Sequence, residues 1–257
     1  MWSDYKKTEN YIKEAYDKNY KLINESYFDV GKTSDSIHQA DGNFLQLCVI
    51  NEQPKNILEI GTWVGNSTYC MASASPHVKI HTVDLGKDNF RIKKRYKQCY
   101  ERIYRNPNTH STEFLRTTNE KFDFFFNDAN LSDEDTNLIF DKSSSSFVFI
   151  SHDFYRFEGN KYVFCKGHDA AERMIKTALS KKYSFSIYAP NSKWYRPGLI
   201  VDDSNNKSIN SGCVMIKFKK SDQNIASNTT LLRSLIEVQR FLRFLKSLPK
   251  KILNKIS

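Results

Sequence analysis

The stretch LEIGTWVGNST, residues Leu58 to Thr68, joins the end of one apolar run to the start of another. The run from Asn56 to Ile60 predicts a strand, which Gly61 breaks. Small and apolar residues from Ser67 to Ala74 then predict a helix, and Lys79 to Val83 predicts a second short strand. Strand, glycine turn, helix and strand together make one βαβ unit, so this stretch favours an α/β fold.

The same alternation continues through the rest of the chain with less regularity. A helix from Phe44 to near Pro54 is expected before the first strand. Beyond the βαβ unit, the predicted helices are Phe90 to Arg105, Asp133 to Asp141 and one from Gly167, and the predicted strands are Thr109 to Leu115, Phe122 to Asn127, Phe147 to Ser151, Tyr183 to Tyr188 and Cys213 to Phe218. Such alternation is typical of a mainly parallel sheet with helices on both faces.

Length and charge limit the organisation of the chain. At 257 residues, the chain suits one α/β domain with additional segments at its ends. We expect a helical N-terminal extension over residues 1–42, the domain over 43–220, and a basic amphipathic helix and tail over 221–257. Of the net charge of +10, residues 231–257 carry +6, from seven basic residues against Glu237 alone. A uniformly basic face is therefore not indicated, and a nucleic-acid partner is not expected.

The pattern of apolar and basic residues from Leu231 to Leu248 predicts an amphipathic helix. Such a helix can lie on an anionic membrane surface, dock on the body of the protein or pair with a second subunit in a homo-oligomer, and the sequence leaves these alternatives open. No apolar run reaches the length of a membrane span, and residues 1–7 lack the apolar stretch of a signal peptide. We therefore expect a cytoplasmic protein, with this helix as the candidate for peripheral membrane contact.

The five cysteines stand far apart in the chain and form no CxxC pair: Cys48, Cys70, Cys99, Cys165 and Cys213. This spacing predicts neither a zinc site nor a disulfide framework. Reduced and buried thiols are expected.

Polar groups follow four of the predicted strands: the turn from Glu59 to Gly65, Asp84, Asp128 with Asn130, and His152 with Asp153. In open α/β sheets, ligands bind beyond the carboxyl ends of the strands. A single carboxylate at such a position can instead cap the next helix. Four polar strand ends together indicate a ligand site.

The turn after the first strand has glycines at positions 61 and 65, which let the backbone bend sharply and direct N–H groups toward a ligand. Its spacing differs from the dinucleotide pattern GxGxxG, because Trp63 and Asn66 stand where two glycines are required. An NAD enzyme is therefore the weaker interpretation. Asp84, at the end of the second strand, suits hydrogen bonds from two ribose hydroxyls and so any nucleoside-containing cofactor.

The segment EIGTWVGNST, from Glu59 to Thr68, resembles motif I of class I S-adenosylmethionine (SAM)-dependent methyltransferases. It is most similar to the branch that includes catechol and caffeoyl-CoA O-methyltransferases and the macrocin-type sugar O-methyltransferases. In that branch a bulkier residue replaces the middle glycine and a Ser follows the last one, as Trp63 and Ser67 do here. The resemblance extends over about Asn43 to Phe218. It implies SAM as the cofactor and a Rossmann-like sheet, mostly parallel with an antiparallel last strand and helices on both faces.

The resemblance also implies which residues bind the cofactor. They are Glu59, Gly61 and Gly65 at the methionine moiety, Ser67 at its carboxylate, Asp84 at the ribose, and His110 and Ser111 near the adenine. Thr62, in the same turn, is also a predicted cofactor-binding residue. The last two lie in the segment THSTEFL, which resembles the family stretch Gly-Asp-Ser-x-x-x-Leu but has Thr and His in place of Gly and Asp.

Asp128, His152 and Asp153 are the candidate catalytic residues, because they resemble the strand ends that carry the catalytic aspartate and the metal ligands of this family. In the metal-dependent members, oxygen ligands at these ends bind Mg²⁺ or another divalent cation, which brings the acceptor hydroxyl into line with the methyl group. All three residues are thus candidate metal ligands. Because histidine is a softer ligand than Asp or Asn, His152 is alternatively the general base that removes the acceptor proton.

The expected function is SAM-dependent O-methylation of a hydroxyl on a sugar, a glycan or a small metabolite. Aromatic residues between Asp153 and Gly167, and in a second insertion from Ala189 to Asn210, are candidates for contact with this acceptor. Two alternatives remain. One is a nucleic-acid methyltransferase, which the pI of about 9.2 favours but for which no NPPY-like motif is present. The other is a membrane-associated protein that keeps the fold without catalysis.

Overall fold

A computed structural model describes residues 39–90, 94–153, 155–158, 161–164, 166–188 and 213–221, together with residues 11, 14, 15, 18 and 37. Two expected features lie outside the described residues: the insertion at 189–210 and the amphipathic helix at 231–248. Most of the expected N-terminal extension, residues 1–42, lies outside them as well. The same holds for the aromatic side chains between Asp153 and Gly167.

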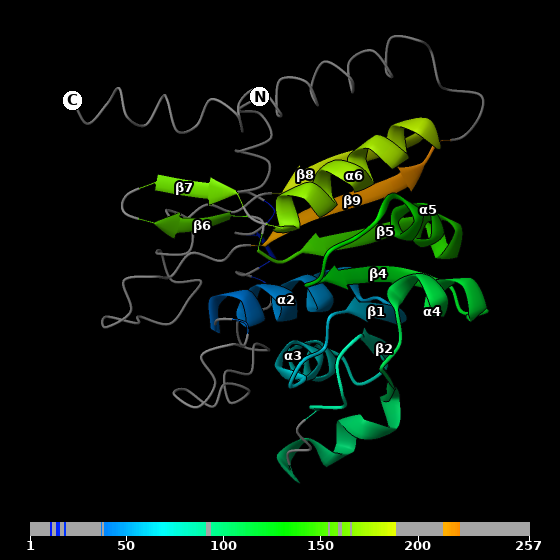
Figure 1. Ribbon diagram of the computed structural model, residues 1–257. Coiled ribbons are helices and arrows are strands. Elements are labelled where there is room, and N and C mark those ends of the chain that lie inside the picture. The colour runs from blue at the N-terminus through cyan, green and yellow to red at the C-terminus, as the bar shows by residue number, and fades with distance from the viewer. Residues whose placement is uncertain are drawn as a thin grey trace.

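A seven-stranded sheet in the order β3-β2-β1-β4-β5-β9-β8 forms the centre of the molecule (Figure 1). Its strands are β1 (Asn56–Ile60), β2 (Lys79–Asp84), β3 (Ile103–Pro107), β4 (Phe122–Asn127), β5 (Ser143–Ser151), β8 (Tyr183–Tyr188) and β9 (Val214–Lys220). The first five strands pair in parallel, whereas β9 is antiparallel to both β5 and β8. A mostly parallel sheet with an antiparallel last strand is thus confirmed. A separate hairpin of β6 (Tyr155–Glu158) and β7 (Lys161–Phe164) follows β5.

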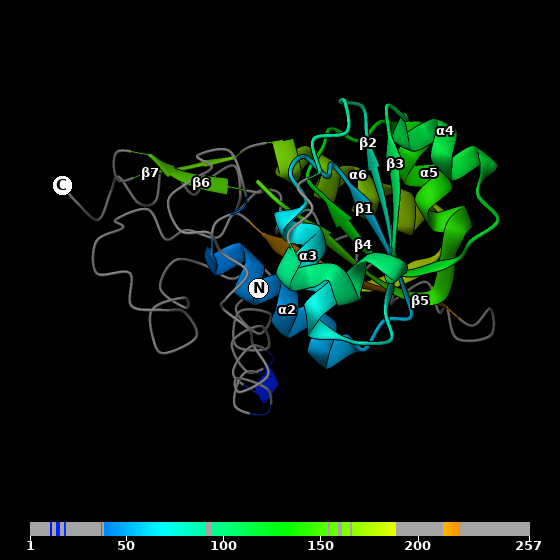
Figure 2. The ribbon, with the colours of Figure 1, turned by 90° about the horizontal axis from the view of Figure 1, so that it is seen from below.

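Helices cover both faces of the sheet, as Figure 2 shows. On one face lie α2 (Gln39–Glu52), α3 (Asn66–Ala74) and the 3₁₀ helix η3 (Lys94–Arg102), and on the other lie α4 (Ser111–Thr117), α5 (Asp133–Lys142) and α6 (Lys166–Ser180). In β4, Phe124 and Phe126 enter the core under α2 and α3, while Phe125 enters the core under α4 to α6. Burial of both faces explains why this strand is an almost continuous run of phenylalanine.

The segment Thr109 to Leu115 is not a strand, so this prediction is wrong. Helix α4 begins at Ser111, and His110 caps it by accepting a hydrogen bond on Nδ1 from the backbone N–H of Thr112 at 3.2 Å. The β-branched and aromatic residues that indicated a strand have weak local preferences, and packing on the sheet and on α5 decides their conformation instead.

The basic helix predicted from Phe90 to Arg105 is wrong over its last residues, which belong to strand β3. Residues Lys94–Arg102 form the 3₁₀ helix η3. Because β3 is an edge strand with no fully buried residue, it lacks the apolar run by which a sheet strand is recognised in a sequence.

Helix α2 begins at Gln39, five residues before the predicted start, and spans the expected boundary between residues 42 and 43. The described Tyr11 packs on this helix and on the sheet, since its hydroxyl donates to Glu52 Oε1 at 2.5 Å and its ring centroid lies 4.8 Å from that of Tyr188.

Among the described residues, no helix is both long enough and apolar enough to cross a membrane.

Candidate active site

The turn between β1 and α3 depends on both of its glycines. Gly61 has φ +92° and Gly65 has φ +83°, a backbone region that other residues rarely adopt. A Cβ atom on Gly61 would lie 2.8 Å from the carbonyl oxygen of Asp128, so the turn packs directly on the end of β4. The backbone N–H of Asp128 also donates to Ile60 O at 2.8 Å. The predicted cofactor turn and the predicted catalytic aspartate are therefore immediate neighbours.

Glu59 fastens the end of β1 to the first turn of α3. Its carboxylate is fully buried and accepts hydrogen bonds from the hydroxyls of Ser67 and, at 2.5 Å, of Thr68. Burial raises the pKa of Glu59 to about 7, although these two hydroxyls act in the opposite direction. The hydrogen bond between Glu59 and Ser67 thus holds the two ends of the turn together. Contacts of these two residues with a cofactor stay a prediction.

Asp84 ties the same turn to the end of β2. Its Oδ2 accepts the backbone N–H groups of Thr62 and Trp63, each at 2.8 Å, and its Oδ1 accepts that of Gly86 at 2.7 Å. The structure therefore brings Gly61, Thr62 and Asp84 together at the carboxyl ends of adjacent strands. This arrangement fits a nucleoside cofactor that lies across β1 and β2.

The segment that carries His110 and Ser111 is joined to the end of β2. The backbone N–H of Thr109 donates to Asp84 O at 3.0 Å, which places the start of α4 beside Asp84. Ser111 is buried and donates to Asp135 Oδ1 at 2.9 Å, whereas the imidazole of His110 caps α4. The contact of this segment with the adenine stays a prediction.

The three predicted catalytic residues come together at the ends of β4 and β5. His152 Nδ1 lies 3.1 Å from Asp128 Oδ1 and 3.4 Å from Asp153 Oδ1. The side chain of His152 is 11% exposed, against 27% for Asp128 and 46% for Asp153, so the histidine lies beneath two carboxylates that are open to solvent. The backbone N–H of His152 donates to Asn127 O at 2.8 Å, which holds the two strand ends in register.

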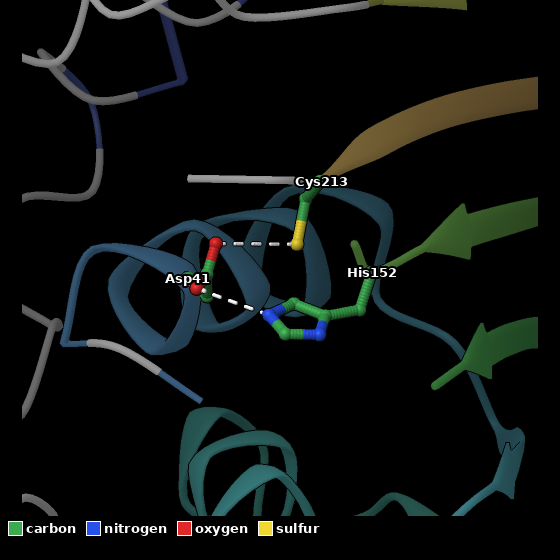
Figure 3. A group of neighbouring side chains, drawn as sticks. All are labelled: Asp41, His152 and Cys213. Carbon is green, nitrogen blue, oxygen red and sulfur yellow. Dashed lines mark hydrogen bonds and ion pairs between the residues drawn. The ribbon is translucent and has the colours of Figure 1, made fainter. Parts of the chain in front are cut away.

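Two further residues at this site, Asp41 and Cys213, were not predicted. The other ring nitrogen of His152, Nε2, lies 3.2 Å from Oδ2 of Asp41 in the first turn of α2 (Figure 3). Asp41 is fully buried, and its Oδ1 accepts a hydrogen bond from Cys213 Sγ at 3.5 Å. These residues are far from one another in the chain, and no local motif marks either of them.

The two ring nitrogens of His152 therefore face carboxylates on opposite sides. Burial alone would lower the pKa of this histidine, but the charge of Asp41 and the hydrogen bonds to Asp128 and Asp41 outweigh it and raise the pKa well above the ordinary value. The imidazolium form, with both nitrogens donating, is thus favoured at neutral pH. A ring in this form cannot act as a general base.

Asp128, His152 and Asp153 do not match Mg²⁺ as a set of ligands. Mg²⁺ takes oxygen ligands, whereas His152 offers a nitrogen. The ring nitrogen nearest the two carboxylates is Nδ1, and in the imidazolium form it carries a proton that it donates toward them. The two carboxylates could bind a cation, but the histidine does not fit as its third ligand. No step of the reaction proposed below depends on a metal at this position.

Comparisons with known proteins show the family and the fold of the chain. A sequence model of the O-methyltransferase family matches residues 14–141, about half of the chain. The O-methyltransferase TomG from Streptomyces achromogenes, solved in complex with SAM, superposes with a TM-score of 0.52 at 15% identity, over 82% of this chain and 90% of TomG. A SAM-dependent O-methyltransferase from Thermotoga maritima superposes with a TM-score of 0.51 at 11% identity, over 76% of this chain and 70% of that one. At these identities the structures show a common fold. No curated protein sequence matches the chain.

Proposed function

Because the chain belongs to the O-methyltransferase family and is a SAM-dependent enzyme, we propose that it methylates a hydroxyl group of a sugar, a glycan or another small metabolite. The observation that carries this proposal is the contact between the glycine turn and Asp128. Gly61 packs against the carbonyl of Asp128, so a methyl donor bound at the turn lies beside a carboxylate that can receive the acceptor proton.

The cofactor site is the edge of the sheet where β1, β2 and the start of α4 meet. SAM, when bound, supplies a methyl group activated by a sulfonium sulfur. In this proposal the Gly61–Gly65 turn accommodates its methionine moiety, Asp84 holds the ribose, and the segment at His110 and Ser111 borders the adenine. The close contact between Gly61 and the backbone of Asp128 fits this role, because it leaves no room for a side chain at position 61.

Asp128 is the proposed proton acceptor. Since the pKa of His152 is raised, its ring stays protonated and donates from Nδ1 to Asp128 Oδ1, which orients the carboxylate. The acceptor hydroxyl then donates its hydrogen bond to this carboxylate, directs its oxygen at the methyl group, and loses its proton to Asp128 as the new O–C bond forms. Positioning of the two reactants contributes much of the rate enhancement in such a site. Asp153, which also lies beside His152, is open to solvent and in this proposal can contact the acceptor.

The proposal is tested by transfer of a radiolabelled methyl group from SAM to a panel of monosaccharides, oligosaccharides and small hydroxylated aromatic compounds. We expect labelled product with at least one of these classes. Asp128→Asn should lose about 10²-fold or more in rate, the usual contribution of a general base, and should keep SAM binding measured by calorimetry. Asp141→Asn is the matched control, because Asp141 lies on the far side of the domain in an exposed ion pair with Lys181.

Three results would contradict the proposal. The absence of SAM binding in calorimetry would refute the cofactor assignment. Labelling of RNA or DNA in place of every small acceptor would refute the acceptor class. Full activity of Asp128→Asn would refute the role of this carboxylate while leaving methyl transfer intact.

A further inference from the structure

We propose that Asp41, His152 and Cys213 form a binding site for a divalent transition metal, with Zn²⁺ as the expected ion. The three side chains come from the first turn of α2, the loop after β5 and the residue before β9, and they converge on one space (Figure 3). Asp41 and Cys213 are fully buried, and His152 as a whole residue is 9% exposed. One ligand atom from each lies within 4.8 Å of the others.

Two distances from the carboxylate of Asp41, one from each of its oxygens, are close to those between neighbouring ligands of a tetrahedral zinc ion. Zinc binds nitrogen and oxygen at about 2.0 Å and sulfur at about 2.3 Å, so neighbouring ligands are about 3.3 Å apart for N and O and about 3.6 Å apart for S and O. Here His152 Nε2 lies 3.2 Å from Asp41 Oδ2, and Cys213 Sγ lies 3.5 Å from Asp41 Oδ1. The three ligand atoms already lie within 4.8 Å of one another, and rotation of the Asp41 carboxylate would bring one of its oxygens to both other ligands.

The chemistry of the ligands selects the kind of ion. A thiolate and an imidazole are soft or intermediate ligands, which suit Zn²⁺ and related transition metals, while Mg²⁺ and Ca²⁺ require oxygen. One Cys, one His and one Asp supply three of the four ligands of a tetrahedral zinc ion. The fourth position is left for water or a further ligand, as in zinc sites that have three protein ligands. This site also differs in position from the one considered above for Mg²⁺, because it uses Nε2 of His152 and lies on the side of α2.

The surroundings of His152 favour the same assignment. Histidines that bind metals through one nitrogen usually donate the N–H of the other to a carboxylate, which orients the ring. His152 Nδ1 faces Asp128 Oδ1 at 3.1 Å, so Asp128 provides this partner when Nε2 binds the ion. The ion would connect the N-terminal helix α2 and the start of β9 to the proposed proton acceptor. His152 Nδ1 donates to Asp128 in both states of the ring, when Nε2 binds the ion and when Nε2 carries a proton.

Binding exchanges protons for the ion without any redox step. Cys213 binds as a thiolate and His152 Nε2 binds without its proton, so the ion replaces one proton on sulfur and one on nitrogen, and both pass to solvent. The site should therefore take up metal more strongly as the pH rises.

The test uses the full-length chain, purified without chelators and with any metal-binding tag removed. Elemental analysis should find about one zinc per chain. After exchange of zinc for Co²⁺, the absorption spectrum should show a thiolate-to-cobalt charge-transfer band. In Cys213→Ser this band should disappear. Cys48→Ser is the matched control and should retain it, because Cys48 is an equally buried thiol that contacts Met215.

Asp41→Asn provides a second variant that preserves side-chain volume, and it should bind zinc at least about 10-fold more weakly. Circular dichroism and thermal unfolding show whether each variant is folded. Failure of the wild-type chain to bind Zn²⁺ or Co²⁺, a bound Co²⁺ without a thiolate band, or a band that persists in Cys213→Ser would each overturn the proposal. None of these measurements needs an acceptor or SAM, so their outcome is independent of the methyltransferase assay.

Discussion

Replacement of Glu59 by Gln should make the protein more stable at alkaline pH and leave its stability unchanged at acid pH. The carboxyl of Glu59 is fully buried, and burial raises its pKa from the ordinary 4.5 to about 7. The folded state therefore holds a proton that the unfolded chain releases above pH 4.5, so wild-type stability falls as the pH rises from about 4.5 to about 7. This difference in pKa corresponds to about 3 kcal/mol in the free energy of unfolding.

Glutamine is neutral at every pH and avoids that loss. Its amide can also stay hydrogen-bonded to the surrounding hydroxyls of Ser67, Thr68 and Thr82, because the amide oxygen accepts and the amide NH2 donates to hydroxyls that now donate to the carboxylate. Urea unfolding of Glu59→Gln and wild type at pH 5 and pH 8.5 measures the effect, with Glu101→Gln as the control at an exposed position. We expect equal stability at pH 5 and a more stable variant, by up to about 3 kcal/mol, at pH 8.5. A variant that is equally destabilised at both pH values would show that the carboxylate itself is required and would refute the reasoning.

Three further predictions follow from the packing and hydrogen bonds. Gly61→Ala should lower the free energy of unfolding in urea by at least about 1–3 kcal/mol, because the left-handed backbone is strained by a side chain and the new Cβ meets Asp128 O; a loss below 0.5 kcal/mol, roughly the scatter for neutral substitutions, would contradict it. Phe149→Ala should cost about 3–5 kcal/mol in the same experiment, since this ring is fully buried under α6, and a smaller loss would indicate that the core collapses around the gap. Asp84→Asn should weaken SAM binding in calorimetry by about 10-fold or more, as expected when a hydrogen bond to a charged group is lost; unchanged affinity would remove Asp84 from the cofactor site.

Most of the sheet could be predicted because its inner strands, such as β1 and β4, are apolar on both faces, and because β8 alternates aromatic or apolar residues with serine. The strands β1, β4 and β8 and helix α3 lie within a residue of their predicted bounds, since each is a short run flanked by glycine, polar or charged residues. Two segments were assigned the wrong kind of element, and both lie where this signal is weak. Strand β3 is an exposed edge strand, and α4 is a helix of only seven residues whose composition favours a strand. Contacts that are distant in sequence decide both.

The candidate site could be predicted in part, for a related reason. Asp84, Asp128 and His152 each follow a recognisable strand, so the rule that ligands bind at strand ends places them together. Asp41 and Cys213 do not follow a predicted strand, so this rule does not select them. They meet His152 only because helix α2 packs beside the start of β9. Cysteine spacing likewise predicts zinc only when the ligands are close in sequence, and therefore it did not indicate this cluster.

The position of β9 has a consequence for the synthesis of the protein. Strand β9, Val214–Lys220, lies between β5 and β8, so β8 joins the sheet only through a strand that follows it in the chain. On the ribosome, β5 must therefore keep an open edge until residue 220 has emerged. Open strand edges pair readily with other chains, and pairings between distant segments form slowly. The nascent chain can thus pair with other chains at this edge until residue 220 has left the ribosome, and a pause before that point would leave the sheet incomplete.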